Sequence, residues 1–362
     1  MRAPLVSVLL LLHRTPRAAA QTAAATPTPG VLACTVATVA GSGTAGTADG
    51  LGTSAQFRDP FTVSYSPSLD AIYVASYGDS TLRLVSLPSG AVTTLVPSAG
   101  GLTSTTSLMG VAADAASPTG NAFFALGCGI SLWNASSRTA SVIAGATATC
   151  VSATDGVGTI ARFFGVEVLA LSPSRVLYMT STSLYTATWG CRIRALDLNT
   201  LDVTTLAGGA SGVSNACGFA DSSAGTSARF SDPRGIAWHP NGNLYIGDMV
   251  NCRIRVVSTT PPFATTTLAG SGTCATVEGT GTSAQFDYPR AVVVDPFGGG
   301  LFAMDSPGIL RSISLNGVVR RLAGIGGVTA TSNDGPCLTT SIGAATGLTV
   351  GADGRTLYYA NM

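Results

Sequence analysis

Lysine is absent from this 362-residue sequence, so all 19 of its basic residues are arginines. Glutamate occurs only twice, at Glu167 and Glu278, and charged residues make up 10% of the chain, with a net charge of +1. Soluble domains average about 25% charged residues. This low and balanced charge argues against a disordered charged protein, against long solvent-exposed helices and against a nucleic-acid partner, which needs a basic surface.

Long hydrophobic runs are missing as well. A transmembrane helix needs about 18 consecutive apolar residues, whereas the apolar run at residues 5–12 is much shorter. This run follows Arg2 and precedes the small residues at 18–20, so it predicts a signal peptide over residues 1–20. We therefore expect a secreted or cell-surface protein with no membrane span within this chain.

The rest of the chain divides into two parts. Residues 21–33 are a low-complexity Ala/Thr/Pro segment, and residues 34–362 form the expected folded domain. Arg14 and Arg17, with no acidic residue before Asp49, would also fit an organelle transit peptide.

The strongest feature that is present is an internal repeat. GTSAQF occurs twice, and GTSARF and GTIARF are close variants, ending at Phe57, Phe163, Phe230 and Phe286. A second element, a β-rich stretch ending in Ala-Gly, ends at Gly41, Gly145, Gly208, Gly270 and Gly324, with a weaker copy ending at Gly100. Between the two elements lie short runs of β-branched and aromatic residues bounded by Gly, Pro, Asn and Asp, which are typical of strands. Four antiparallel strands per unit predict the blades of a β-propeller.

Counting the units predicts how the ring closes. Five units are followed by a partial sixth at residues 347–361, and residues 34–41 form a closing strand that has no earlier strands of its own. We expect an all-β, six-bladed propeller in which this N-terminal strand completes the last blade and removes the free sheet edges. The third strand of the sixth blade is not found, so this blade is three-stranded or the chain is part of a longer product. The repeated phenylalanines are expected to fill the seams between blades.

These residues carry a family resemblance. The stretch NLYIGDMVNCRIRVV (residues 243–257), followed by TLAGSGT (residues 267–273), resembles the NHL repeat, the blade unit of six-bladed NHL propellers. It resembles in particular secreted or membrane-attached NHL-repeat proteins of protists and bacteria. Cys252 stands where that family commonly has a histidine.

The eight cysteines support an oxidising compartment. Three pairs of cysteines occupy equivalent positions in their blades. One cysteine of each pair lies at the start of the third strand and the other lies just past the fourth strand, and these two positions are neighbours in an antiparallel sheet. We therefore expect disulfides in three blades: Cys128–Cys150, Cys191–Cys217 and Cys252–Cys274. The alternative is buried free thiols. Cys34 and Cys337 remain. Cys34 precedes the closing strand and Cys337 is expected in a loop at the opposite end of the same blade, so a bond between them looks strained, and either could pair beyond residue 362.

Other polar residues have a structural and a functional interpretation. His239, the only histidine after residue 20, is interpreted as a turn residue. Recurrent acids before each unit are either turn-shaping residues or calcium ligands: Asp49, Asp155, Asp221 and Asp334. Asp248 and Asp305 end second strands and are expected to bind backbone amides. Paired arginines on third strands either contact neighbouring-blade acids or bind phosphate or glycan: Arg192, Arg194, Arg253 and Arg255.

The resemblance also implies activities to be weighed. An amidating lyase of this fold needs a zinc ion bound by several histidines, and one histidine cannot form that site. NHL domains that bind RNA need a basic face, which this neutral, lysine-free chain does not offer. Lactonases of this fold hold calcium on central carboxylates; Glu167, on a predicted inner strand, faces the channel or an adjacent blade and is the best residue for such a calcium-dependent hydrolase or lyase.

We therefore expect an extracellular, non-enzymatic binding module that presents loops on a disulfide-stapled propeller. Its partner would be an unknown protein or glycan, and no cofactor is expected. Asn134 lies in an Asn-Ala-Ser sequon and is a candidate glycosylation site.

Overall fold

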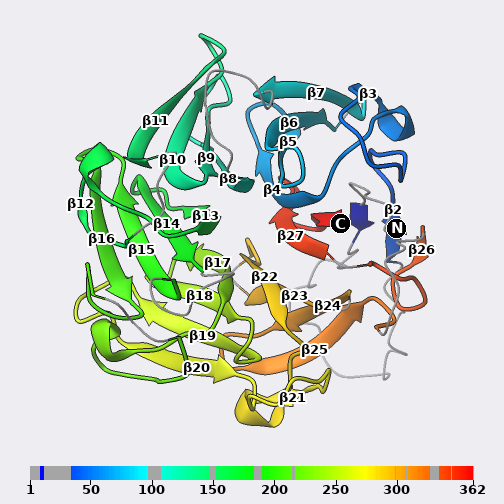
Figure 1. The fold of residues 1–362 in the computed structure, drawn as a ribbon. Coiled ribbons are helices and arrows are strands. Elements are labelled where there is room, and N and C mark those ends of the chain that lie inside the picture. The colour runs from blue at the N-terminus through cyan, green and yellow to red at the C-terminus, as the bar shows by residue number, and fades with distance from the viewer. Residues whose placement is uncertain are drawn as a thin grey trace, which may run out of the picture.

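A computed structural model describes residues 9–11, 34–87, 89–96, 107–146, 152–182, 190–213, 217–297, 299–306, 308–326, 334–343 and 345–361. The described residues form six antiparallel sheets of four or five strands each. Figure 1 shows the sheets arranged in a ring around a central axis, with the innermost strand of each facing that axis. The protein is an all-β propeller, as the repeat predicts.

The first three sheets follow one another along the chain. The first contains β3 (Gly50–Leu51), β4 (Pro60–Ser66), β5 (Ala71–Ser76), β6 (Thr81–Ser86) and β7 (Ala91–Val96). The second contains β8 (Leu108–Ala113), β9 (Ala122–Leu126), β10 (Cys128–Asn134) and β11 (Thr139–Ala146). The third contains β12 (Gly156–Val157), β13 (Val166–Leu171), β14 (Val176–Ser181), β15 (Arg192–Asp197) and β16 (Asp202–Ala207).

The other three sheets continue the ring. The fourth contains β17 (Pro233–His239), β18 (Asn243–Asp248), β19 (Arg253–Ser258) and β20 (Thr265–Ala269). The fifth contains β21 (Gly279–Thr280), β22 (Pro289–Val294), β23 (Leu301–Asp305), β24 (Ile309–Ile313) and β25 (Val318–Ala323). The sixth contains β26 (Gly335–Pro336), β2 (Thr35–Ala37), β1 (Leu9–Leu11), β28 (Thr356–Asn361) and β27 (Ala345–Val350).

The segment that joins one sheet to the next adds structure that the sequence did not predict. In four sheets it contributes a two-residue fifth strand at the outer edge, namely β3, β12, β21 and β26. A single turn of 3-10 helix from the repeated Gly-Thr-Ser or Gly-Thr-Ile then leads inward at Gly52–Ser54, Gly158–Ile160, Gly225–Ser227 and Gly281–Ser283. The repeated hexapeptide is therefore the connection between the outer edge of a sheet and its innermost strand.

The recurring Ala-Gly element has a steric cause. Gly208 follows β16 with a φ of +92°, and a Cβ atom there would lie 2.3 Å from the carbonyl oxygen of Cys191. Gly270 repeats this arrangement after β20, with a φ of +109° and 2.6 Å to the carbonyl oxygen of Cys252. Only glycine combines a positive φ with so close an approach of two backbones.

The repeated phenylalanines fill the seams between sheets, which confirms their expected role. Phe230 is completely buried and packs in one cluster with Ile193 of the third sheet and Leu244 of the fourth. Phe286 packs likewise with Ile254 of the fourth sheet and Leu301 of the fifth. Each sheet is apolar on both faces and covers its neighbour, which explains the low content of charged residues.

The ring closes between the sixth and first sheets. The Thr349 hydroxyl accepts a hydrogen bond of 3.1 Å from the Tyr65 amide of β4. Thr346 donates one of 2.7 Å to the Phe61 carbonyl oxygen. The Tyr65 and Tyr358 rings stack with centroids 6.3 Å apart. Residues from the two ends of the domain therefore form this seam.

The sixth sheet corrects the expectation of a missing third strand. β2 takes the outer position expected of the N-terminal closing strand, but β1 lies between β2 and β28, where a third strand belongs. Leu10 pairs with Val36 on one side and with Leu357 on the other. The third strand thus comes from within the predicted signal peptide, whose role as a strand no repeat pattern indicated.

The disulfides pin the connecting segments to the sheets. Cys191–Cys217 and Cys252–Cys274 are formed, with Cα atoms 5.6 and 5.2 Å apart. Cys128 is also disulfide-bonded, and its expected partner, Cys150, lies outside the described residues.

Cys34 and Cys337 are bonded to each other, with Cα atoms 5.4 Å apart. The sequence interpretation placed them at opposite ends of one blade. The short strand β26 pairs with β2 and brings the Cys337 amide within 3.0 Å of the Cys34 carbonyl oxygen, so the two cysteines are neighbours. No helix among the described residues is long and apolar enough to cross a membrane.

Candidate functional site at the central channel

The six innermost strands enclose a cavity of about 220 Å³ on the axis of the ring. Its wall is mostly apolar, with residues such as Val63, Leu169, Ile236 and Val292, and among the described residues that line it Arg290 is the one that carries a charge. Hydroxyl side chains join neighbouring innermost strands across this wall. Thr62 donates to the Met109 carbonyl oxygen at 2.5 Å, and the Ala113 amide donates to Ser64 at 2.9 Å.

A β-bulge near the start of each innermost strand forms one end of the channel. In β4 the pairing with β5 skips from Pro60 to Thr62, and in β22 it skips from Pro289 to Ala291. Bulges re-aim the side chain of the extra residue. The corresponding residues of five strands form what we call the channel-mouth ring: Phe61, Glu167, Arg234, Arg290 and Thr346.

Glu167 is the acidic residue of the channel-mouth ring. Its side chain is completely buried; one carboxylate oxygen accepts a hydrogen bond from the Thr182 hydroxyl, and the other lies 3.5 Å from Arg234 Nε. Burial raises the pKa of Glu167, while the positive charge of Arg234 opposes the rise. Of the two orientations expected from the sequence, Glu167 faces the adjacent fourth sheet and does not line the cavity.

Arg234 links three sheets. Its Nε lies 3.2 Å from Asp232 and 3.5 Å from Glu167 of the third sheet, and its guanidinium carbon is 5.9 Å from the centre of the Phe61 ring in the first sheet. These neighbouring carboxylates raise the pKa of Arg234 against the effect of burial, which lowers it. The carboxylates at this end of the channel are therefore engaged in ion pairs within the protein.

A second polar feature repeats around the ring. In four sheets the third strand carries an arginine that is at most 1% exposed: Arg83, Arg194, Arg255 and Arg311. Each guanidinium lies over the phenylalanine of the repeated hexapeptide, between 4.7 and 5.7 Å from the ring centre. In three of the four sheets it also binds an acid of the connecting segment, in the pairs Arg83–Asp49, Arg194–Asp155 and Arg255–Asp221, at 2.6 to 2.8 Å.

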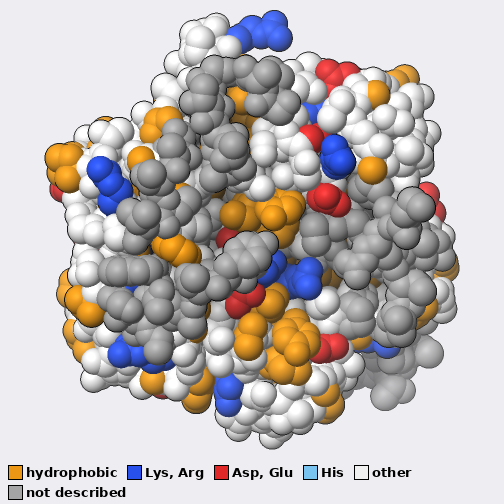
Figure 2. Space-filling model, in the orientation of Figure 1, with side chains coloured by type: hydrophobic (Ala, Val, Ile, Leu, Met, Phe, Trp, Pro, Cys, Tyr) orange, Lys and Arg blue, Asp and Glu red, His pale blue; other side chains and the backbone are white. Residues whose placement is uncertain are grey.

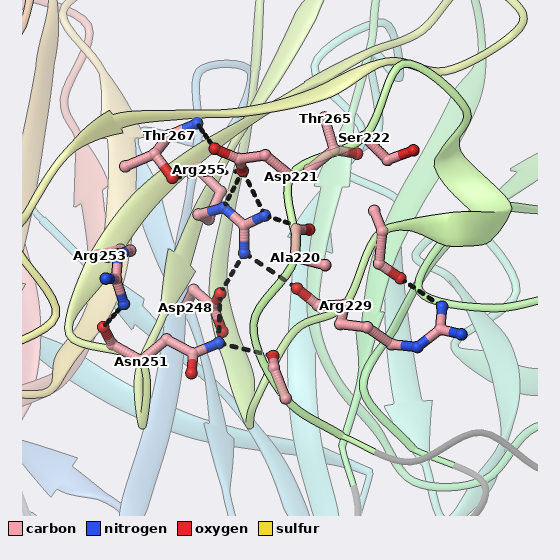
Figure 3. A network of polar contacts seen from close by, with 12 residues as sticks. Ala220, Asp221, Ser222, Arg229, Asp248, Asn251, Arg253, Arg255, Thr265 and Thr267 are labelled. Carbon is pink, nitrogen blue, oxygen red and sulfur yellow. Dashed lines mark hydrogen bonds and ion pairs between the residues drawn. The ribbon is translucent and has the colours of Figure 1, made fainter.

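The contacts of Arg255 show the arrangement in full (Figure 3). Arg255 Nη2 lies 2.6 Å from Asp221 and donates to the Ala220 carbonyl oxygen at 2.8 Å, while Nη1 lies 2.6 Å from Asp248 and donates to the Arg229 carbonyl oxygen at 3.0 Å. Asp221 also accepts hydrogen bonds from the amide and hydroxyl of Thr267. The buried arginine thus connects the third strand, the connecting segment and the outer strand.

The recurrent acids contact arginine and threonine side chains. Asp49, Asp155 and Asp221 bind arginine and a threonine of the outer strand, and Asp334 binds Thr38 at 3.0 Å. The acids belong to the connecting segment of the same sheet and not to a neighbouring blade. Arg192 and Arg253 donate to carbonyl oxygens of loops, those of Ala210 and Ser271 among them.

The remaining candidates lie away from the channel mouth. His239 Nδ1 accepts a hydrogen bond of 3.0 Å from the Asn241 amide, as expected of a turn residue. Asn134 ends β10, and its side-chain oxygen accepts hydrogen bonds of 3.1 Å from the Ser136 and Ser137 amides. Asp248 accepts the Ser231 amide at 2.8 Å, as expected, in addition to Arg255.

Sequence reasoning missed Arg234 and Arg290. The available signal was their position directly after the recurring proline, where Glu167 also aligns. Within the part of the chain that the structure describes, no three His, Cys, Asp or Glu side chains are grouped as metal ligands.

Comparison with known proteins supports the fold. No family model and no curated protein sequence matches this chain. Among solved structures, a protein of unknown function from Bacteroides thetaiotaomicron is 15% identical with a TM-score of 0.63, and the match covers 98% of this chain and 90% of that one.

Two further solved structures are similar. A gluconolactonase from Xanthomonas campestris is 11% identical with a TM-score of 0.59, over 100% of this chain and 94% of its own. An auxiliary nutrient binding protein from Bacteroides thetaiotaomicron is 15% identical with a TM-score of 0.58, over 84% and 67%. At these identities the likeness establishes the β-propeller fold alone.

Proposed function

We propose that this chain is an extracellular, non-enzymatic interaction module, an NHL-type, six-bladed propeller whose connecting segments bind a protein or glycan ligand. The observation that carries the proposal is where the exposed hydrophobic side chains lie. Of the twelve large ones in the described part of the chain, nine are in segments that connect one sheet to the next: Leu51, Val157, Ile160, Val213, Phe219, Val277, Tyr288, Ile325 and Leu338. Their recurrence on equivalent connecting segments, and not within the sheets, favours these segments as the interaction surface.

The connecting segments also have the rigidity that recognition favours. Cys217, Cys274 and Cys337 lie in three of them, and each is bonded to a cysteine that directly precedes a strand of a sheet. Buried arginines hold three connecting segments from inside, through Asp49, Asp155 and Asp221, and the segment of Asp221 also carries Cys217. A preorganised loop loses less entropy on binding. Disulfides are typical of secreted and surface proteins, which supports the proposed location.

The surface composition supports a neutral ligand or one with little charge. Figure 2 shows a face on which the described surface is mostly uncharged, with separate hydrophobic patches and scattered arginine and acidic side chains. Such a surface offers little long-range attraction for a polyanion.

The proposal is tested with the purified, folded protein on immobilised glycan and extracellular-protein panels. We expect specific binding that weakens at least tenfold in the triple variant Leu51→Ser, Ile160→Ser, Val277→Ser. Phe297→Ser is the matched control, because Phe297 is 63% exposed but lies in a turn within the fifth sheet. Blank panels with folded protein, or equal losses in both variants, would contradict the proposal.

The alternative, a calcium-dependent hydrolase or lyase that uses Glu167, makes a different prediction. It requires calcium to raise the thermal midpoint of the wild-type protein and Glu167→Gln to abolish that rise. Because Glu167 already pairs with Arg234 and Thr182, we expect calcium to leave the midpoint of both proteins unchanged.

A further inference from the structure

The third strand of the sixth sheet comes from a segment that export would remove. β1 lies between β28 and β2, and its residues 9–11 fall within the signal peptide proposed for residues 1–20. Cleavage takes away this strand and leaves the hydrogen-bonding edges of β28 and β2 facing each other. A strand that enters this gap is paired on both sides.

β2 remains attached when β1 is removed. Its outer edge pairs with β26, and the Cys34–Cys337 disulfide joins the two strands. Thr38 donates to Asp334 at 3.0 Å, and the Gly41 amide donates to the Gly52 carbonyl oxygen at 3.1 Å in the next connecting segment. The gap is therefore held open by contacts that do not depend on β1.

The other sheets indicate what side chain belongs in the gap. Their buried arginines occur opposite one fixed position of the second strand, as in the pairs Arg194–Met179, Arg255–Ile246 and Arg311–Ala303. In the fourth sheet this position, Ile246, lies two residues before Asp248 at the end of the second strand. Asn361 aligns with Asp248 at the end of β28, so the corresponding position in β28 is Tyr359. Residues 3–12 contain no arginine.

The polar groups that would receive this arginine are present. Asn361 aligns with Asp248 and Asp305, its side chain is completely buried, and neither its amide nitrogen nor its oxygen has a hydrogen-bond partner among the described residues. A buried amide without partners is destabilising, so a donor or acceptor supplied by a ligand would be favoured there. Asp334 aligns with Asp221. It accepts a hydrogen bond from the Thr38 hydroxyl, as Asp221 does from the Thr267 hydroxyl. Ile342 takes the place of the repeated phenylalanine, so the ring contact is not reproduced.

We propose that the gap between β28 and β2 is a strand-binding site for an extended peptide of a partner protein, with an arginine opposite Tyr359 that binds Asn361 and Asp334. Backbone pairing to both edges supplies affinity, as in β-strand addition. The charge-assisted contact with Asp334 selects arginine. The inference rests on cleavage of the leader and is independent of ligand binding by the connecting segments.

The test uses the secreted protein, whose N-terminus is determined by mass spectrometry, and a labelled peptide with the sequence of residues 250–258 carrying Cys252→Ser. We expect saturable binding by fluorescence anisotropy, and slower amide hydrogen exchange at residues 35–37 and 356–361. A peptide that also carries Arg255→Gln should bind at least tenfold more weakly. Absence of binding, equal binding of the two peptides, or protection confined to the fourth sheet would overturn the proposal.

Protein variants complete the test. A form with an uncleavable leader keeps β1 in place, so it should bind the peptide at least tenfold more weakly than the cleaved protein. Asp334→Asn should weaken binding in the cleaved protein, whereas Asp202→Asn, an exposed acid on β16, should not. A secreted protein that still begins at Met1, or equal affinities across these forms, would refute the inference, while array binding by the connecting segments would be unaffected.

Discussion

Arg255 and Asp221 form an ion pair of 2.6 Å although 34 residues separate them in the sequence. Arg255 is completely buried, and Asp221 lies in the segment that connects the third sheet to the fourth. The pair fastens the outer part of a connecting segment to the middle of a sheet. Equivalent pairs in the first and third sheets make this fastening a repeated feature of the ring.

Replacing Arg255 with methionine should destabilise the protein by about 3–5 kcal/mol, because it leaves Asp248 buried without its cation. Asp248 is completely buried and lies 2.6 Å from Arg255 Nη1. The free energy of unfolding in guanidinium chloride measures the loss. Arg138→Met is the control: Arg138 lies in an exposed turn, and its replacement should change stability by less than about 0.5 kcal/mol. Similar losses in the two variants would contradict the structural role of Arg255.

Phe230→Ala should cost about 3–5 kcal/mol, since it removes a fully buried ring and leaves a cavity in the seam between two sheets. Phe297→Ala removes the same group from a side chain that is 63% exposed, and we expect a change of less than about 0.5 kcal/mol. Thermal unfolding of the two variants beside the wild type gives the comparison. A small loss for Phe230→Ala would mean that the seam repacks without it.

The sequence predicted the strands and the seams because both depend on local patterns. Phe230 and its repeats follow the same hexapeptide each time, and the strands alternate with turn residues that are visible along the chain. The all-β propeller follows from these patterns. Gly208 and its repeats were recognised as boundaries, although their steric cause appears only when the third strand lies beside them.

Features that depend on pairing between distant segments could not be predicted in the same way. Arg234 points into the channel mouth because β17 bulges against β18, and a bulge has no signature in a single strand. Cys337 lies beside Cys34 because β26, a strand of two residues, pairs with β2. Such short pairings are set by the closed ring and not by local propensity.

Stability should depend on pH through Asp248. Burial raises the pKa of Asp248 to about 6, although Arg255, Asn251 and the Ser231 amide oppose the rise. The unfolded carboxyl has a pKa of about 3.9, so between about pH 4 and pH 6 the folded protein holds a proton that the unfolded chain has lost. The free energy of unfolding therefore falls as pH rises through this range.

The variant Asp248→Asn isolates this effect, because other titrating groups contribute equally to both proteins. The free energy of unfolding of the wild type, taken relative to the variant, should fall by on the order of 3 kcal/mol between pH 3.5 and pH 7. Denaturant unfolding at a series of pH values measures the difference. A constant difference, or one that grows with pH, would show that Asp248 is ionised throughout.

The two kinds of disulfide should differ in their contribution to stability. Cys34–Cys337 closes the ring across a sequence separation of 303 residues, whereas Cys252–Cys274 spans 22. If the bonds act by restricting the unfolded chain, the longer loop contributes about 5–6 kcal/mol and the shorter about 3 kcal/mol. The double variant Cys34→Ala, Cys337→Ala should therefore unfold at a lower guanidinium concentration than Cys252→Ala, Cys274→Ala. The seam contacts between β27 and β4 are present in both variants, so they do not alter this comparison. Equal midpoints would therefore contradict the account in which the bonds act on the unfolded chain.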